Sequence, residues 1–164
     1  MAQAGKAATE KIVSILTAPA GLNGNLAALS QAAGLTLPAL AASQILGQNV
    51  SIELAGRATD VKYPTLHIYC EKLSNVLREK FRTFSGTASM AIEVRVSQDR
   101  MEGLQNALQV YLDAVTQLLD QNRGDWGGGM FYSGGYEAAI EPLKRGGRNF
   151  IQVAKVTFQV GVSN

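Results

Sequence analysis

The feature that most constrains the fold is a strictly alternating stretch that leads directly into a long amphipathic stretch. In residues 90–97 every even position is apolar and every odd position is small or charged, which is the period of a β-strand with one buried and one solvated face. In residues 100–120 apolar side chains recur three and four positions apart, the period of a helix with one apolar stripe. Asp99, with Glu102 three positions later, predicts an acidic capping box that starts this helix at Arg100.

Further strands are predicted on both sides of this unit. Residues 50–54 alternate, residues 66–70 follow Pro64 with Leu66, Ile68 and Cys70 on one face, and residues 149–162 carry apolar side chains at nearly every even position. Residues 74–82 are expected to be helical or irregular. A turn at Gly146-Gly147 makes residues 136–162 a long hairpin. The order of elements predicts an α+β fold, a mostly antiparallel sheet with a long helix packed on one face.

The N-terminal part has a different character. Residues 7–17 predict a short amphipathic helix, whereas residues 22–46 are rich in Ala, Leu, Gly and Asn and are interrupted by Gly24, Gly34 and Pro38. Such short pieces are not stable alone, so we expect this segment to become ordered only against another surface. The sequence therefore predicts an N-terminal helical, Ala-rich arm (residues 1–46) and an α+β domain (residues 47–164).

Composition excludes several classes of protein. The chain has 164 residues and a formal net charge of +2, so a nucleic-acid partner held through many phosphates is not implied, although this total does not exclude a local basic patch. Cys70 is the single cysteine, so no intrachain disulfide forms and a reducing compartment is expected. The apolar run at residues 12–16 is shorter than a secretory core, and no run reaches membrane-spanning length. We expect a cytoplasmic, unprocessed chain with no membrane partner.

Catalytic signals are weak throughout the chain. His67 is the single histidine and lies in a predicted strand, no serine sits in a Gly-x-Ser-x-Gly motif, and one His with one Cys cannot close a zinc shell. The glycines at 127–129 are not followed by Gly-Lys-Ser or Gly-Lys-Thr. We therefore expect no catalytic residues, no metal and no cofactor, and an enzyme is the third-ranked hypothesis.

Two clusters are candidates for contact with other molecules. From Gly124 to Tyr136, five aromatic or Met side chains lie among six glycines: Trp126, Met130, Phe131, Tyr132 and Tyr136. This combination is typical of a flexible loop at a subunit interface. The alternative is that this loop folds back on its own core. Three basic side chains surround the Gly146-Gly147 turn: Lys144, Arg145 and Arg148. They are a candidate contact with DNA or with an acidic partner. The alternative is an ordinary charged hairpin tip.

Several of these stretches together resemble a family. Tyr63-Pro64 opens a strand, residues 81–87 (FRTFSGT) precede the alternating strand at residues 92–96, and the long helix follows. Residues 131–137 (FYSGGYE) and the closing strand at residues 150–162 complete the pattern. Over roughly residues 50–164 the chain resembles tail terminator or neck (tail completion) proteins of tailed bacteriophages. Residues 1–46 fall outside the resemblance.

The resemblance implies a subunit of a ring, commonly a homohexamer, in the tail or neck of a virion. Such a ring caps the tail tube and joins it to the head-completion or connector protein, with a sheath protein as a further neighbour if the tail is contractile. DNA would pass through the lumen without sequence-specific binding. Assembly would take place in the host cytoplasm. A closed ring needs two different patches that meet head to tail, for which the aromatic glycine loop and a sheet edge are candidates.

Other assignments stay open. A second virion role is a head-completion or adaptor protein, or another structural subunit of the tail. From a different class, a small nucleic-acid-binding module is suggested by basic residues interleaved with Phe81 and Phe84: Lys72, Arg78, Lys80 and Arg82.

Overall fold

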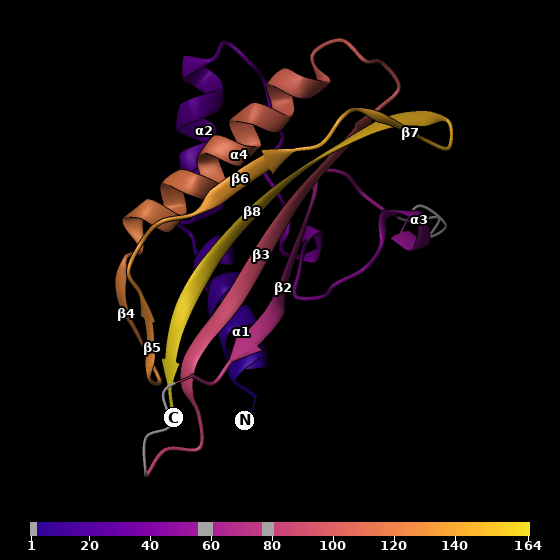
Figure 1. Cartoon of the computed structure of the whole chain (residues 1–164). Coiled ribbons are helices and arrows are strands. Elements are labelled where there is room, and N and C mark those ends of the chain that lie inside the picture. Colours follow the sequence, from indigo (N-terminus) through magenta and orange to yellow (C-terminus); the bar gives the residue numbers. More distant parts are fainter. Residues whose placement is uncertain (1–2, 56–60, 77–80) are drawn as a thin grey trace.

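The computed structural model describes residues 3–55, 61–76 and 81–164. In this part of the chain three longer helices lie on one side of a curled eight-stranded sheet, a one-turn helix stands apart from them, and both termini lie at the same end of the molecule (Figure 1). The α+β class and the mostly antiparallel sheet predicted from the sequence are confirmed.

The sheet is built on its two longest strands. β3 (Ser85–Gln98) and β8 (Asn149–Ser163) are antiparallel and pair along their whole length, from Ser85 opposite Ser163 to Gln98 opposite Phe150. β2 (Thr65–Ser74) lies antiparallel on the other side of β3, and β1 (Ile45–Leu46) adds a short parallel strand to β2. Four short strands complete the side next to β8: β4 (Gly124–Gly127), β5 (Met130–Tyr132), β6 (Glu137–Ile140) and β7 (Lys144–Gly146).

The predicted hairpin at residues 136–162 is present. β6 and β7 both pair antiparallel with β8, and the chain turns at Gly146 and Gly147 before it enters β8. Gly147 has φ 73°, a left-handed conformation that glycine adopts without steric cost. The hairpin projects beyond the rest of the sheet in Figure 1.

The main helices pack on the face of the sheet that carries the even-numbered side chains of β3. α4 (Leu104–Gln121) lies across β3 and β8, and α1 (Ala4–Thr17) lies across β2 and β3. α2 (Leu22–Ala32) packs mainly on α4. Ile92 and Val94 are fully buried beneath these helices, because the period of two in β3 directs every second side chain to the same face.

The N-terminal segment is ordered against this chain's own sheet and helix. Ile12, Leu16, Leu22 and Leu26 belong to the same buried cluster as the apolar side chains of β3 and α4. Asn23 in α2 holds the later part of the segment at Leu40, because its side-chain amide donates one hydrogen bond to the backbone of Leu40 and accepts another from it. The surface against which this segment was expected to become ordered is therefore this chain's own sheet and helix.

Two local predictions were wrong. Residues 50–54 form no strand; they enter the one-turn helix α3 (Ile52–Ala55), and Leu54 is exposed, so the short alternation at these positions buries no face. α4 begins at Leu104 and not at Arg100. Its N-cap is Gly103 with φ 77°, and no side chain caps it, because the left-handed backbone at Gly103 separates the Asp99 region from the helix.

The odd-numbered face of β3 was predicted to be solvated, but it is largely buried in its middle. Ala91 and Arg95 are almost fully buried, and Arg95 donates a hydrogen bond to the backbone oxygen of Val50. The chain between β1 and α3 therefore crosses this face of the sheet, and a long-range contact of this kind leaves no periodic signal in β3.

In the described part of the chain no single helix is long and apolar enough to cross a membrane, although α1 and α2, which meet at a bend of 49°, would together have the length and composition of a bent span.

Candidate subunit interface

The aromatic glycine segment forms a small hairpin, β4 and β5, at the end of α4. Three of its five candidate side chains, Trp126, Met130 and Tyr132, are buried in the core. The ring of Tyr132 lies 5.4 Å from that of Trp126 and 5.4 Å from that of Phe158 on β8, measured between centroids. The indole nitrogen of Trp126 donates to the backbone oxygen of Asn122 at the end of α4. For these three residues the alternative prediction holds, that the loop folds back on its own core. They are enclosed between the pleated strand β5 and the surface of β8.

The other two candidates face outward. Phe131 is 54% exposed and Tyr136 is 38% exposed. Phe131 alternates with the buried Met130 and Tyr132 along β5, as a strand at the side of a sheet requires. Tyr136 directly precedes β6. These two residues stay candidates for contact with a neighbour.

The predicted basic cluster lies together at the tip of the β7–β8 hairpin. Arg145 and Arg148 are exposed, and Lys144 lies 3.0 Å from a carboxylate oxygen of Glu141 in an exposed ion pair. A pair of this kind contributes little to stability. The hairpin tip therefore presents two arginines beside a partly neutralised lysine, and it can reach an acidic surface of a partner.

The basic residues proposed for nucleic-acid binding are not presented as a stacking platform in the described structure. Arg78 and Lys80 lie outside the described residues. Of the two aromatic residues, Phe81 is exposed but Phe84 is almost fully buried, so Phe84 cannot stack on a base. Arg82 donates to the backbone oxygen of Ser163. This geometry offers one aromatic ring where repeated stacking needs several.

β6 forms an open edge of the sheet, and the position of this edge was not predicted from the sequence. Its four residues are exposed, and it pairs only with β8 among the described strands. Its outward side therefore presents backbone N–H and C=O groups that a further strand can use. Ile140 is 41% exposed here. The sequence feature that could have indicated this open edge is the short apolar run Ala138-Ala139-Ile140, inside one arm of the predicted hairpin.

The second open edge lies on the opposite side of the sheet. β1 covers only Leu66 and His67 of β2, so in the described structure no strand pairs with the outer side of β2 from Ile68 onward. A groove of about 870 Å³ runs beside this edge between β2 and α1. Gly5 of α1 approaches so closely that a side-chain carbon there would lie 3.1 Å from the β-carbon of Cys70. The floor of the groove includes Thr9, Val13, Cys70 and Leu73.

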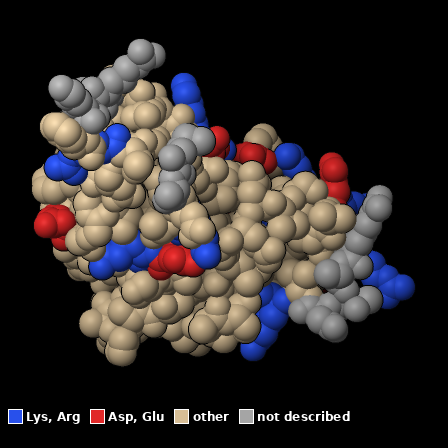
Figure 2. Space-filling model, turned by 90° about the horizontal axis from the view of Figure 1, so that it is seen from below, with Lys and Arg blue, Asp and Glu red and all other residues tan. Residues whose placement is uncertain are grey.

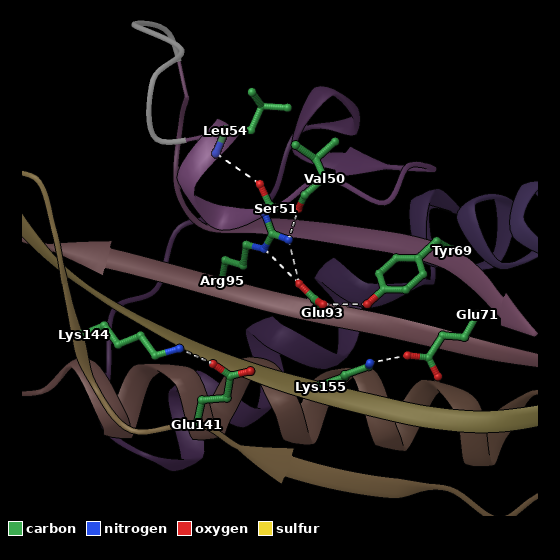
Figure 3. A network of polar contacts seen from close by, with 10 residues as sticks. All are labelled: Val50, Ser51, Leu54, Tyr69, Glu71, Glu93, Arg95, Glu141, Lys144 and Lys155. Atoms are coloured by element: carbon green, nitrogen blue, oxygen red, sulfur yellow. Dashed lines mark hydrogen bonds and ion pairs between the residues drawn. The ribbon is translucent and has the colours of Figure 1, made fainter.

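A polar network spans β2, β3 and β8 on the face of the sheet away from the helices (Figure 3). Arg95 donates to the same carboxylate oxygen of Glu93 through Nε at 3.1 Å and through Nη2 at 2.7 Å. The hydroxyl of Tyr69 donates to the other oxygen of Glu93 at 2.6 Å. Lys155 on β8 pairs with Glu71 on β2. The network ties β2, β3, β8 and the chain at Val50 into one unit.

This network shifts the pKa values of its members. Burial alone would raise the pKa of Glu93, but the hydrogen bonds from Tyr69 and Arg95 and the charge of Arg95 outweigh it and lower that pKa. Burial, followed by the hydrogen bond to Glu93, raises the pKa of Tyr69 to about 12. Glu93 is therefore ionised, and Tyr69 keeps its proton, over the whole neutral range.

His67 lies beside this network, directly opposite Glu93 on the neighbouring strand. It is almost fully buried, and its Nδ1 atom has no hydrogen-bond partner among the described residues. Burial, and next the charge of Arg95, lower the pKa of His67. The imidazole is therefore neutral at neutral pH.

His67→Gln is expected to flatten the pH dependence of stability in mildly acidic solution. The pKa of His67 in the folded chain lies below its ordinary value of 6.5, so the unfolded chain binds more protons. The free energy of unfolding is unaffected above that value and falls as the pH decreases toward the folded-state pKa, by up to about 1.4 kcal/mol per pH unit. Urea unfolding at several pH values measures this slope in both proteins. The same slope in the variant would show that His67 does not cause it.

Charged side chains of both signs lie on the face of the molecule that is seen from below (Figure 2). Figure 2 shows Lys and Arg interspersed with Asp and Glu on the face seen from below, with uncharged surface between them. Among the described residues no group of three or more His, Cys, Asp or Glu side chains is placed to hold a metal ion.

No protein-family model matches the sequence. A search of curated proteins likewise finds no matching sequence.

Proposed function

We propose that this chain is a structural virion protein, a subunit of the tail terminator ring that caps the tail tube of a tailed bacteriophage and joins it to the neck. The observation that carries the proposal is the pair of open edges, β2 and β6, on opposite sides of one sheet. Two different surfaces on each copy are what head-to-tail assembly into a ring requires.

The tail assignment rests on the resemblance over residues 50–164. The stretches that carry it occupy connected parts of the sheet: residues 81–87 lead into β3, residues 131–137 link β5 to β6, and residues 150–162 form most of β8. All three stretches therefore lie in β8 itself, or lie in or lead into strands that pair with β8. The proposed ring is a homohexamer, as is common in the family.

The charge pattern supports a ring that lets DNA pass. A formal charge of +2 with interspersed signs provides no continuous basic surface on the face in Figure 2, and few phosphate contacts mean weak retention of DNA. Axial neighbours of the ring would be the tail tube protein on one side and the head-completion or connector protein on the other. The arginine-bearing β7–β8 hairpin is a surface for one of them, or for a sheath protein in a contractile tail.

Native mass spectrometry of the purified chain tests the ring, and electron microscopy of tail tubes incubated with it tests the tail role. We expect a closed oligomer, with the hexamer as the main species, and density at one end of each tube. A monomer at micromolar concentration would contradict the ring. A ring of twelve copies that ignores tail tubes would favour a head-completion or adaptor protein, and salt-dependent binding to single-stranded DNA would favour the nucleic-acid module.

A further inference from the structure

The two open edges run in directions that allow them to pair. β3 is antiparallel to β2, β8 is antiparallel to β3, and β6 is antiparallel to β8. β6 therefore runs opposite to β2. If the sheet of one copy continues into the sheet of the next, β6 and β2 meet as antiparallel strands, the arrangement with the more favourable hydrogen-bond geometry.

The side chains of β6 divide between the two faces of the sheet. Ala138 and Ile140 pair with Val156 and Ala154 of β8, which are core residues on the helix side. Glu137 and Ala139 face the other side, opposite Thr157 and Lys155. Because side chains alternate along a strand, this division is preserved when a further strand pairs with β6.

The side chains of β2 divide in a matching way. Ile68 and Cys70 pair with Ile92 and Met90 on the helix side. After the irregularity between Cys70 and Lys72, Lys72 pairs with Ser89 on the other side. An added strand that follows the spacing of β3 would set Ile140 opposite Ile68, Ala138 opposite Cys70 and Glu137 opposite Lys72.

This register gives three of the four side chains of β6 a suitable neighbour. Ile140 and Ala138 would enter the groove beside α1, where Val13 and Leu73 provide apolar contacts. Small side chains suit this site, because α1 approaches β2 closely at Gly5. On the other face Glu137 would meet Lys72, which makes no ion pair within the described part of the chain.

We infer that β6 of one copy docks antiparallel on the outer edge of β2 of the next copy, in the groove beside α1, so that the sheet is continuous around the ring. The occupant is a second copy of this chain, since the same molecule provides an open donor edge, an open acceptor edge and opposite charges at matching positions. Tyr136, which is exposed next to β6, extends the contact. This inference rests on the proposed ring and identifies its interface.

A disulfide crosslink tests the inference directly, because Cys70 is the only cysteine. In Ala138→Cys, oxidation with diamide is expected to join the introduced thiol to Cys70 of the neighbouring copy and to give a ladder of covalent oligomers on a non-reducing gel. Within one copy β2 and β6 are separated by β3 and β8. That spacing is about 14 Å between the two strands, too far for an internal disulfide.

Two matched variants serve as controls. Ala139→Cys places the thiol on the opposite face of β6, so no ladder is expected, and Ala138→Cys combined with Cys70→Ser removes the partner thiol. A ring of normal mass whose Ala138→Cys form gives no ladder would overturn the inference and leave the proposed ring intact. A wild-type monomer would overturn both. A ring that forms the ladder but ignores tail tubes would overturn only the tail role.

A charge reversal tests the register if the cysteine variant fails to assemble. Glu137→Lys and Lys72→Glu are each expected to raise the concentration at which half of the chain is assembled about tenfold, and the double variant is expected to restore assembly because the pair is re-formed with its signs exchanged. Both positions are exposed, so folding should be unaffected, which circular dichroism checks. Single variants that assemble normally, or a double variant no better than the singles, would contradict the pairing.

Discussion

Replacing Tyr132 by alanine is expected to lower the free energy of unfolding by about 3–5 kcal/mol. The side chain is fully buried between Trp126 and Phe158, so its removal leaves a cavity at the junction of β5, β8 and the end of α4. Its hydroxyl also donates to the backbone oxygen of Gly135, a contact that positions the chain ahead of β6. Urea unfolding followed by circular dichroism measures the loss.

Phe131→Ala is the matched control, because Phe131 is the neighbouring aromatic residue on the same strand but is 54% exposed. It should change the free energy of unfolding by less than about 0.5 kcal/mol. If Tyr132→Ala instead left folding unchanged and reduced assembly, Tyr132 would belong to the subunit interface and not to the core. Equal losses in both variants would show that the two side chains are not distinguished by burial.

Glu93→Ala is expected to cost about 3 kcal/mol of stability at neutral pH, because it leaves the guanidinium of Arg95 buried without its counter-charge. Arg95 is 2% exposed and Glu93 is 16% exposed, so water cannot replace the lost carboxylate fully. Nη1 of Arg95 already has no partner among the described residues. The hydrogen bond from Tyr69 is lost as well, so the variant should unfold at a lower urea concentration than the wild type.

Glu71→Ala controls for the loss of a carboxylate on the same face. Its ion pair with Lys155 is about one-third exposed on both sides, and an exposed pair contributes at most about 1 kcal/mol. Replacing Glu93 and Arg95 together by methionine should recover most of the lost stability, because no unpaired charge remains. A double variant as unstable as Glu93→Ala would show that packing, and not the unpaired charge, causes the loss.

The depressed pKa of Glu93 also gives this loss a pH window. The stabilisation by Glu93 is complete above the ordinary carboxyl value of 4.5 and is lost as the pH falls through the lower folded-state pKa. The difference between wild type and Glu93→Ala should therefore shrink in strongly acidic solution. The effect of His67 begins at higher pH, below its ordinary value of 6.5, and comparing His67→Gln with Glu93→Ala in the same titration separates the two contributions.

Where local pattern and burial coincide, the sequence predicted the structure well. The strand around Ile92 and the helix that follows it were predicted from period, and the hairpin ending in β8 was predicted from period together with the Gly146-Gly147 turn. All three are present. The segment between Trp126 and Tyr136 was less predictable. Its glycines interrupt any period, and Gly128 and Gly129 serve the β4–β5 turn with φ 61° and 75°, a conformation that glycine adopts freely.

By itself, then, the sequence determined the α+β class, the positions of the two long strands and of the long helix, and the hairpin that ends in β8, because these depend on period and residue type. Only the tertiary structure decided which of the candidate side chains are exposed. Trp126 and Tyr132 lie inside while Phe131 lies outside, and Arg95 is covered by the chain at Val50. The open edges of β2 and β6 were also decided at this level. Whether an edge is free depends on contacts between residues far apart in the chain, and such contacts leave no local period to read.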